Sequence, residues 1–297
     1  MAKIVKFTLT AAIICLGITA ASFSFAQDST NIDTTAATTD EQISAQDLGV
    51  SNPTLLPNNP FYFLKEWVRS TRLAFTFNNV KKVELENKFS NEKLVELRKM
   101  TENKVAPEKI KKATENYQKS VEKIKNIADK IKDTAENNPE VNKFLEKFTN
   151  QQVLQEKILQ KLQTQVPEAV FEKIKEAREQ HLERFKDVMT KLEENKDKIV
   201  EKLKNALQNG DESNTEILEK IKEKMPEAVQ QKIEAIKTNI VNKVIEKAEQ
   251  KNETNNCLAI EKPVTDFCKL GRIKIVKDEK GCAVRFLCII PNAPVNE

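Results

Sequence analysis

Four cysteines near the C-terminus are the residues whose types and spacing have the clearest chemical meaning. They are Cys257, Cys268, Cys282 and Cys288 of a 297-residue chain. Their spacing lacks the close cysteine pairs of zinc ribbons, which makes a metal site the weaker interpretation. In an exported chain, four cysteines favour two disulfides. We therefore expect a disulfide-stapled module over residues 257–290, with no metal and no cofactor.

The residues around these cysteines predict a β-hairpin, which limits how the cysteines can pair. The β-rich segments 272–277 and 282–288 flank a four-residue turn that ends in Gly281. An extended second strand would place Cys282 and Cys288 about 20 Å apart, too far for a disulfide between them. Two of the three possible connectivities therefore remain.

The hairpin register favours one of these two connectivities. Counting residue pairs back from the turn places Gly271 opposite Cys288. Cys268 is then nearer to Cys288 than to Cys282. We favour a disulfide between Cys268 and Cys288 and a second one between Cys257 and Cys282.

The same tail is weakly similar to a known kind of disulfide module. The run Phe267-Cys-Lys-Leu-Gly271, followed by Asp278 and Gly281-Cys282, resembles the short modules of antistasin-type protease inhibitors. The resemblance covers only this tail and implies a module that inhibits a protease or binds a receptor. The alternative is a small stapled end of the chain with a structural role.

Few other side chains are suited to catalysis. His181 is the only histidine, and its spacing from neighbouring apolar residues favours a half-buried position on a helix seam over a pH switch. Carboxylates such as Glu193 and Glu194 alternate with lysines at helical spacing, as on a solvent-exposed helix face. No glycine lies between Gly49 and Gly210, which excludes a glycine-rich phosphate loop there. We expect no catalytic residue and no enzyme.

The charge balance argues against nucleic acid as a partner. The chain has 49 basic and 45 acidic residues, and its formal net charge is +4. Because the two signs are interleaved along the sequence, no extended basic patch is predicted.

The N-terminus predicts export. Residues 1–26 have two lysines, then an apolar run, then a small residue at Ala26, as in a secretory signal peptide. We expect a secreted, periplasmic or cell-envelope protein, with an uncleaved membrane anchor as the alternative. Residues 27–54 are rich in Ser, Thr and acidic residues, which predicts a disordered acidic linker.

The rest of the chain predicts an all-α protein built from long amphipathic helices in antiparallel hairpins or a coiled-coil-like bundle. The helical body covers residues 55–250, with an aromatic-rich start (55–105), long helices (107–209) and further helices (213–250). A polar linker (251–256) joins it to the cysteine module.

One long apolar seam predicts how the helices pack. Its members recur at gaps of three and four residues and are Ile110, Ala113, Tyr117, Val121, Ile124, Ala128, Ile131 and Ala135. They predict a helix from Pro107 to Glu136 that packs on another helix, and such seams also permit self-association. Gln152 and Gln155 occupy seam positions of the next helix, which predicts a buried polar layer that fixes the register.

An aromatic-rich helix over residues 58–77 has two interpretations. Its main apolar residues are Phe61, Phe63, Leu64, Trp67 and Val68. We favour a core helix, because so many exposed apolar side chains would invite aggregation. The alternative is a partner-binding or membrane-interface helix with Lys65, Arg69 and Arg72 on its polar side.

The opening of the helical body resembles a known family. The runs Leu55-Leu-Pro-Asn-Asn-Pro-Phe-Tyr-Phe-Leu-Lys65 and Arg72-Leu-Ala-Phe-Thr-Phe77 are similar to the start of an uncharacterised family of secreted bacterial helical proteins, a domain of unknown function. The resemblance covers about residues 55–192. It implies an exported, all-helical envelope protein with no assigned activity.

Taken together, these features predict an exported, non-enzymatic helical scaffold or interaction protein of the bacterial cell envelope. The expected partner is an unknown envelope or extracellular protein. Nucleic acid is not expected, and membrane contact is possible but not favoured.

Overall fold

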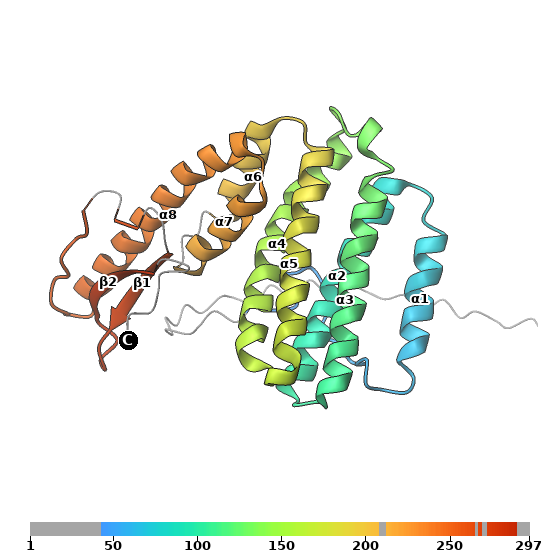
Figure 1. Cartoon of the computed structure of the whole chain (residues 1–297), viewed down its shortest axis with the longest axis horizontal. Helices are drawn as coiled ribbons and strands as arrows, with labels where there is room; N and C mark the ends of the chain where they lie inside the picture. Colours follow the sequence, from blue (N-terminus) through green and yellow to red (C-terminus); the bar gives the residue numbers. More distant parts are fainter. Residues whose placement is uncertain (1–42, 208–211, 265–266, 269–271, 290–297) are drawn as a thin grey trace, which may run out of the picture. The chain divides into compact units, whose positions relative to one another are not determined.

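Four long helices form a bundle (Figure 1). The computed structural model describes residues 43–207, 212–264, 267–268 and 272–289. The bundle helices are α2 (Asn79–Glu102), α3 (Pro107–Ala128), α4 (Pro139–Gln165) and α5 (Glu168–Leu192). Helix α2 packs against α3 and α4, and α5 packs against the same two helices. Helices α2 and α5 therefore lie at opposite corners of the bundle.

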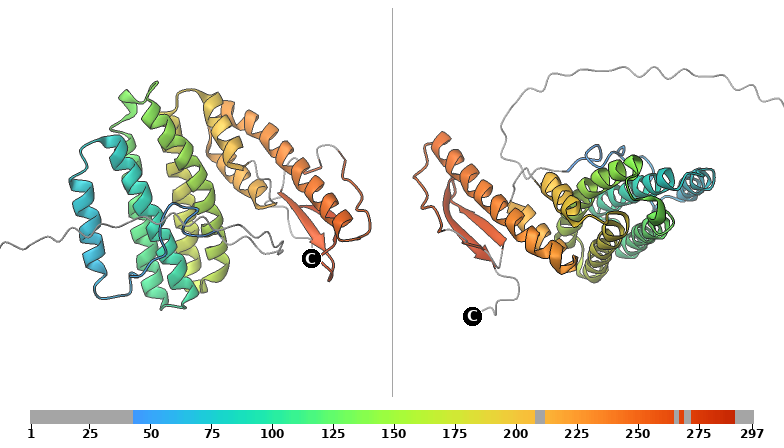
Figure 2. Two further views of the ribbon diagram at one scale, coloured as in Figure 1. Left: turned by 180° about the vertical axis from the view of Figure 1, so that it is seen from behind. Right: turned by 90° about the horizontal axis from the view of Figure 1, so that it is seen from above.

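The remaining elements pack on two sides of this bundle. Helix α1 (Tyr62–Ala74) packs against α2 and lies at the outer edge of the helices in both views of Figure 2. Helix α6 (Lys196–Leu207) packs against α4, α7 (Glu212–Lys224) packs against α4 and α5, and α8 (Glu227–Thr254) packs on α6 and α7. Strands β1 (Arg272–Lys277) and β2 (Ala283–Ile289) form an antiparallel hairpin. The predicted all-α class with a small C-terminal hairpin is confirmed. The predicted signal peptide, residues 1–26, lies outside the described residues.

The predicted seam is buried, but it belongs to two helical pieces. All eight seam residues are at most 7% exposed. The expected helix from Pro107 to Glu136 is wrong in length, because α3 ends at Ala128 and a short 3₁₀ helix, η1 (Lys132–Thr134), follows. Asn138 then begins α4 by accepting hydrogen bonds from the backbone N–H groups of the first turn.

A layer of buried polar side chains crosses the bundle at mid-height and separates two apolar cores. Each of the four helices contributes near its middle: Glu86, Asn87, Ser90 and Asn91 from α2, Tyr117 and Ser120 from α3, Gln151, Gln152 and Gln155 from α4, and His181 from α5. The predicted polar layer around Gln152 and Gln155 is therefore present. It is larger than the sequence indicated, because all four helices take part.

The side chains of this layer bond to one another in a chain. The Tyr117 hydroxyl lies 2.9 Å from Gln155 Oε1 and 3.0 Å from His181 Nδ1. The Gln155 amide donates to Asn91 Oδ1, and Asn91 in turn donates to the Leu48 carbonyl oxygen at 2.8 Å. These bonds specify how the helices align, because a shift along any axis would break several buried bonds.

His181 is fully buried and stays neutral at physiological pH. Its Nε2 lies 3.2 Å from the Gln152 carbonyl oxygen, which can only accept, so Nε2 carries the ring proton. Burial lowers the pKa of His181 to about 4, and the nearby Arg178 contributes to the lowering. The expectation of a half-buried residue therefore understated its burial, since only 1% of the residue is exposed.

The N-terminal segment 43–50 is part of the core, which corrects the prediction that residues 27–54 are a disordered linker throughout. Ala45, Leu48 and Val50 are buried among residues of the bundle. Gly49 allows the tight turn because its φ is +70°, and a Cβ there would lie 3.3 Å from Gln151 Nε2. The prediction missed these three apolar residues because it rested on the average composition of residues 27–54, which is polar and acidic.

The cysteine module is docked on the helical body rather than separated from it. The predicted linker 251–256 is wrong, since α8 continues to Thr254. The Asn252 side chain bonds to both backbone groups of Ala283, at 2.7 Å and 2.8 Å, and to the Leu258 carbonyl at 3.1 Å. Ile273 and Phe286 join the same apolar core as α8. The module therefore packs on α7 and on the end of α8.

The structure joins Cys257 to Cys282 and Cys268 to Cys288, the pairing that the sequence favoured. The expected register was wrong by two residues at Cys288, which lies opposite Ile273 and not opposite Gly271. One residue of the difference comes from a longer turn and one from a β-bulge beside Lys277. The favoured pairing is nevertheless correct, because it required only that Cys268 lie nearer to Cys288 than to Cys282.

We expect Asn252→Ala to loosen the hairpin without unfolding the bundle. The change removes three hydrogen bonds that hold buried backbone groups, at a cost of about 1–3 kcal/mol. Amide hydrogen exchange over residues 272–289 should quicken roughly 10- to 100-fold. Asn242→Ala is the matched control, because Asn242 is exposed on the same helix. Equal exchange rates in the two variants would contradict the docking.

We expect His181→Gln to make the protein less sensitive to acid. The folded-state pKa of His181 lies near 4 and the unfolded one near 6.5, so the unfolded chain gains this proton first as the pH falls. The stabilisation that neutral His181 contributes is therefore complete above pH 6.5 and is lost as the pH falls towards 4. Relative to wild type, the variant should gain about 2 kcal/mol in unfolding free energy between pH 8 and pH 5.

Urea unfolding of both proteins at the two pH values measures this difference. Burial raises the pKa of Glu156 to about 7 despite its contact with Arg178, and this group has the opposite pH dependence. Its effect is common to both proteins and cancels in the comparison. If the variant differs from wild type by the same unfolding free energy at both pH values, the lowered pKa of His181 is contradicted.

Candidate interaction surface

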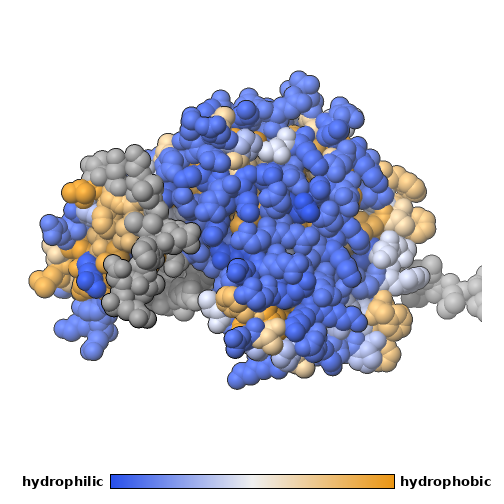
Figure 3. Space-filling view, viewed as in Figure 1, coloured by the Kyte–Doolittle hydropathy of each residue, from blue (hydrophilic) through white to orange (hydrophobic). Residues whose placement is uncertain are grey.

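The apolar side of α1 faces solvent. The residues Phe61, Phe63, Leu64, Trp67, Val68, Phe75 and Phe77 are between 48% and 85% exposed. We call these seven residues the α1 face. In Figure 3, hydrophobic side chains gather along the right-hand edge, where Figure 1 places α1. The favoured prediction of a core helix with a buried Trp67 is therefore wrong, and the alternative of an interaction helix stays a prediction.

The polar side of α1 faces inward because α2 presents charges to it. Arg69 is only 4% exposed and contacts carboxylates from both helices. Its guanidinium lies 2.7 Å from Glu92, 2.7 Å from Glu96 and 2.5 Å from Glu66. The same guanidinium donates to the Tyr62 hydroxyl at 2.8 Å. Three carboxylates and one hydroxyl thus stabilise the buried guanidinium of Arg69.

Two lysines complete this arrangement. Lys65 lies 2.7 Å from Glu96, and Lys93 lies 3.3 Å from Glu66. We call Lys65, Glu66, Arg69, Glu92, Lys93 and Glu96, with Tyr62, the charge cluster. Its three cations and three carboxylates cancel, so that α1 and α2 can pack closely without leaving a net buried charge.

The cluster fixes the protonation of its members. Burial opposes ionisation of Arg69, but the attraction of Glu96 and the other carboxylates outweighs it and raises the pKa of Arg69 above its ordinary value. Burial and the Glu96 carboxylate raise the pKa of Tyr62, so its hydroxyl stays protonated and donates to Glu96. Arg69 also lies over the Phe89 ring, 5.8 Å from the centroid.

The sequence contained a signal for this orientation. Glu92 and Glu96 are four residues apart and form an acidic stripe on α2. Lys65 and Arg69 have the same spacing on α1. Pairing the two stripes turns the polar side of α1 inward, whereas the usual rule turns the apolar side inward.

The other residues weighed as chemical candidates have structural partners. His181 belongs to the polar layer. Glu193 is buried and lies 3.0 Å from Lys202, so it does not form an acid–base pair with Glu194. Within the described part of the chain, no group of three or more His, Cys, Asp and Glu side chains is arranged to hold a metal ion.

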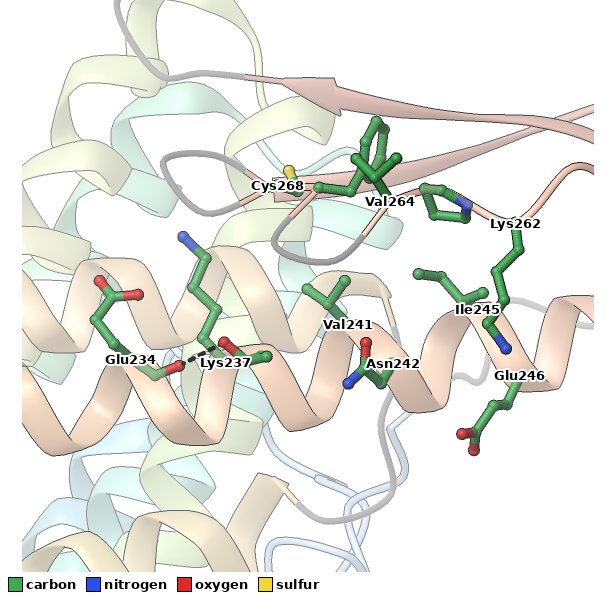
Figure 4. A pocket seen from close by; sticks show the side chains of 12 residues that line it. Glu234, Lys237, Val241, Asn242, Ile245, Glu246, Lys262, Val264 and Cys268 are labelled. Carbon is green, nitrogen blue, oxygen red and sulfur yellow. Dashed lines mark hydrogen bonds between the residues drawn. The ribbon is translucent and has the colours of Figure 1, made fainter.

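A pocket of about 380 Å³ lies between α8 and the segment that contains Lys262 and Cys268. Figure 4 shows Val241 and Ile245 pointing from α8 towards that segment. The pocket's two lysines are already paired, Lys237 with Glu219 at 2.7 Å and Lys262 with Glu249 at 3.4 Å. We therefore regard the α1 face as the stronger candidate site.

None of the described helices is long and apolar enough to cross a lipid bilayer. The apolar residues of α1 lie along one side of a helix of 13 residues, which is about 20 Å long. An apolar side of this length is suited to lie against the surface of a partner or a membrane.

We expect opposite results from substitutions on the two sides of α1. Arg69→Met leaves the three carboxylates of the charge cluster with only two lysines, so that one buried negative charge is uncompensated, which costs about 3–5 kcal/mol. Amide exchange in α1 should then quicken roughly 100-fold or more. Trp67→Ser removes an exposed side chain and should change the unfolding free energy by less than about 0.5 kcal/mol.

Trp67 fluorescence provides an independent check of the same orientation. In buffer without lipid, the emission maximum of the wild-type protein should be that of a solvent-exposed indole, since 67% of the residue is exposed. A blue-shifted maximum, together with a large loss of stability in Trp67→Ser, would show that the helix packs with its apolar side inward.

Comparison with known proteins identifies one part of the chain. No curated protein and no solved structure matches the chain significantly. Residues 54–195 match the family described as DUF5667, a domain of unknown function. The match begins before α1 and ends just after α5, so it contains the charge cluster, the α1 face and the four-helix bundle. A DUF5667 domain therefore forms the N-terminal part of the helical body.

Proposed function

We propose that this protein is an exported, non-enzymatic helical scaffold that attaches to the surface of a membrane through the α1 face. The observation that carries the proposal is the orientation of α1. Helix α1 and the residues that flank it present seven large apolar side chains to solvent, while the polar side of α1 is bonded to α2.

The chemistry of the α1 face suits the interfacial region of a bilayer. Aromatic side chains, Trp in particular, favour the boundary between headgroups and acyl chains. An amphipathic helix in this region lies parallel to the membrane plane with its apolar side buried about 5–10 Å deep. Helix α1 has this form before it meets a membrane. Binding therefore does not require the ordering of a disordered segment, which would weaken it.

The rest of the molecule supports a role in attachment or presentation. The two disulfides indicate an oxidising extracellular or periplasmic location. The packed cores and the docked hairpin support a rigid body that can present a surface to an envelope or extracellular partner. The antistasin-like function of the cysteine module stays a prediction, because only the tail carries that resemblance.

Binding to phosphatidylcholine vesicles tests the proposal. We expect the wild-type protein to sediment with vesicles and its Trp67 emission to shift to the blue. The far-UV circular dichroism should stay unchanged, because the helix is already formed. Phe63→Ser combined with Trp67→Ser should abolish sedimentation, since two of the largest inserted side chains are lost.

A matched control removes two exposed apolar residues elsewhere. Leu258 and Val284 are 90% and 51% exposed and lie in the C-terminal module. Leu258→Ser combined with Val284→Ser should leave vesicle binding intact. Failure of the wild-type protein to bind both these vesicles and vesicles that contain anionic lipid would overturn the proposal. If it instead forms a dimer that the Phe63→Ser and Trp67→Ser changes dissociate, the α1 face is an interface between copies.

A further inference from the structure

We infer that the membrane recognised by the α1 face is anionic, and that a basic corner between α1 and α2 provides the selectivity. This inference rests on the proposed function and names the lipid class that it would use. The basic corner consists of Arg72, Lys81 and Lys82.

The basic residues around α1 fall into two groups. Lys65, Arg69 and Lys93 belong to the charge cluster and are neutralised by its carboxylates. Arg72, Lys81 and Lys82 have no ion pair with any described carboxylate. Of the three residues first considered on the polar side of α1, only Arg72 is therefore free to meet an external anion.

The basic corner is next to the most exposed aromatic residues. Phe75 and Phe77 follow α1 directly and are 74% and 85% exposed. Arg72 precedes Phe75 by about one helical turn, and Lys81 follows Phe77 in the first turn of α2. The Arg72 guanidinium lies over the Phe89 ring, 5.7 Å from its centroid, which holds it at this end of α1. Apolar and cationic groups thus share one end of the surface.

Local charge supports an anionic partner. Between Leu48 and Val83, Glu66 is the only acidic residue, and the charge cluster neutralises it. Glu84 is exposed one helical turn after Lys81, so the three cations of the basic corner exceed the nearby acidic charge by two. Elsewhere the helices interleave acidic and basic residues. An anionic leaflet attracts unpaired Lys and Arg near its surface by about 1 kcal/mol each. Zwitterionic lipid supplies no such attraction, so the corner favours anionic headgroups.

The test compares two vesicle compositions. The full chain without residues 1–26 is mixed with vesicles of phosphatidylcholine alone, or of equal parts phosphatidylcholine and phosphatidylglycerol. We expect wild type to bind the anionic vesicles more tightly. Replacing Arg72, Lys81 and Lys82 by Gln should weaken binding to anionic vesicles roughly 100-fold at low ionic strength. Binding to phosphatidylcholine alone should not change.

A charge-matched control separates a local site from general attraction. Lys104, Lys109 and Lys112 are exposed beyond the opposite end of α2. Replacing them by Gln removes the same charge and should retain the preference for anionic vesicles. An equal loss in this control, or a retained preference in the corner variant, would overturn the inference while the proposed function stands. Failure of wild type to bind either vesicle would overturn both.

Discussion

The burial of one guanidinium decides which side of α1 faces solvent. Arg69 is surrounded by carboxylates of both helices, and a buried charge without such partners would be strongly destabilising. Rotating α1 to bury Trp67 would carry Arg69 away from Glu92 and Glu96 and leave those two carboxylates unpaired. The structure keeps these ion pairs and forgoes the apolar burial that rotation would gain. The apolar side is therefore left facing solvent.

A second polar arrangement governs the bundle. The polar layer crosses the middle of all four helices, and apolar residues fill the space above and below it. Apolar side chains alone would tolerate small shifts of one helix along another. Directional bonds such as that between Asn91 and Gln155 do not. The layer thus defines the alignment, and the two apolar cores supply most of the favourable burial.

The sequence predicted the features that depend on local pattern. Apolar spacing identified the seam of α3, and the two glutamines at seam positions identified part of the polar layer. The favoured cysteine pairing also agrees with the structure, although the strand register behind it did not. The bulge beside Lys277 depends on how the hairpin packs on α8, which no pattern within the strands reveals.

The candidate site was harder to predict because it depends on two segments at once. The amphipathic rule assigns the apolar side of a helix to the core, and it holds for α3. It fails for α1, whose polar side has a charged partner on α2. The polar layer likewise includes Leu48, whose carbonyl accepts bonds from Asn91 and Gln151. Only the assembled fold brings these groups together.

The buried segment 43–50 also bears on where the folding unit begins. The family match starts at residue 54, yet Ala45, Leu48 and Val50 fill part of the bundle core. A fragment cut at the start of the match would expose the apolar residues beneath them and deprive two buried amides of their shared carbonyl. The segment that the family match covers is therefore shorter than the segment that must be expressed to obtain a stable bundle.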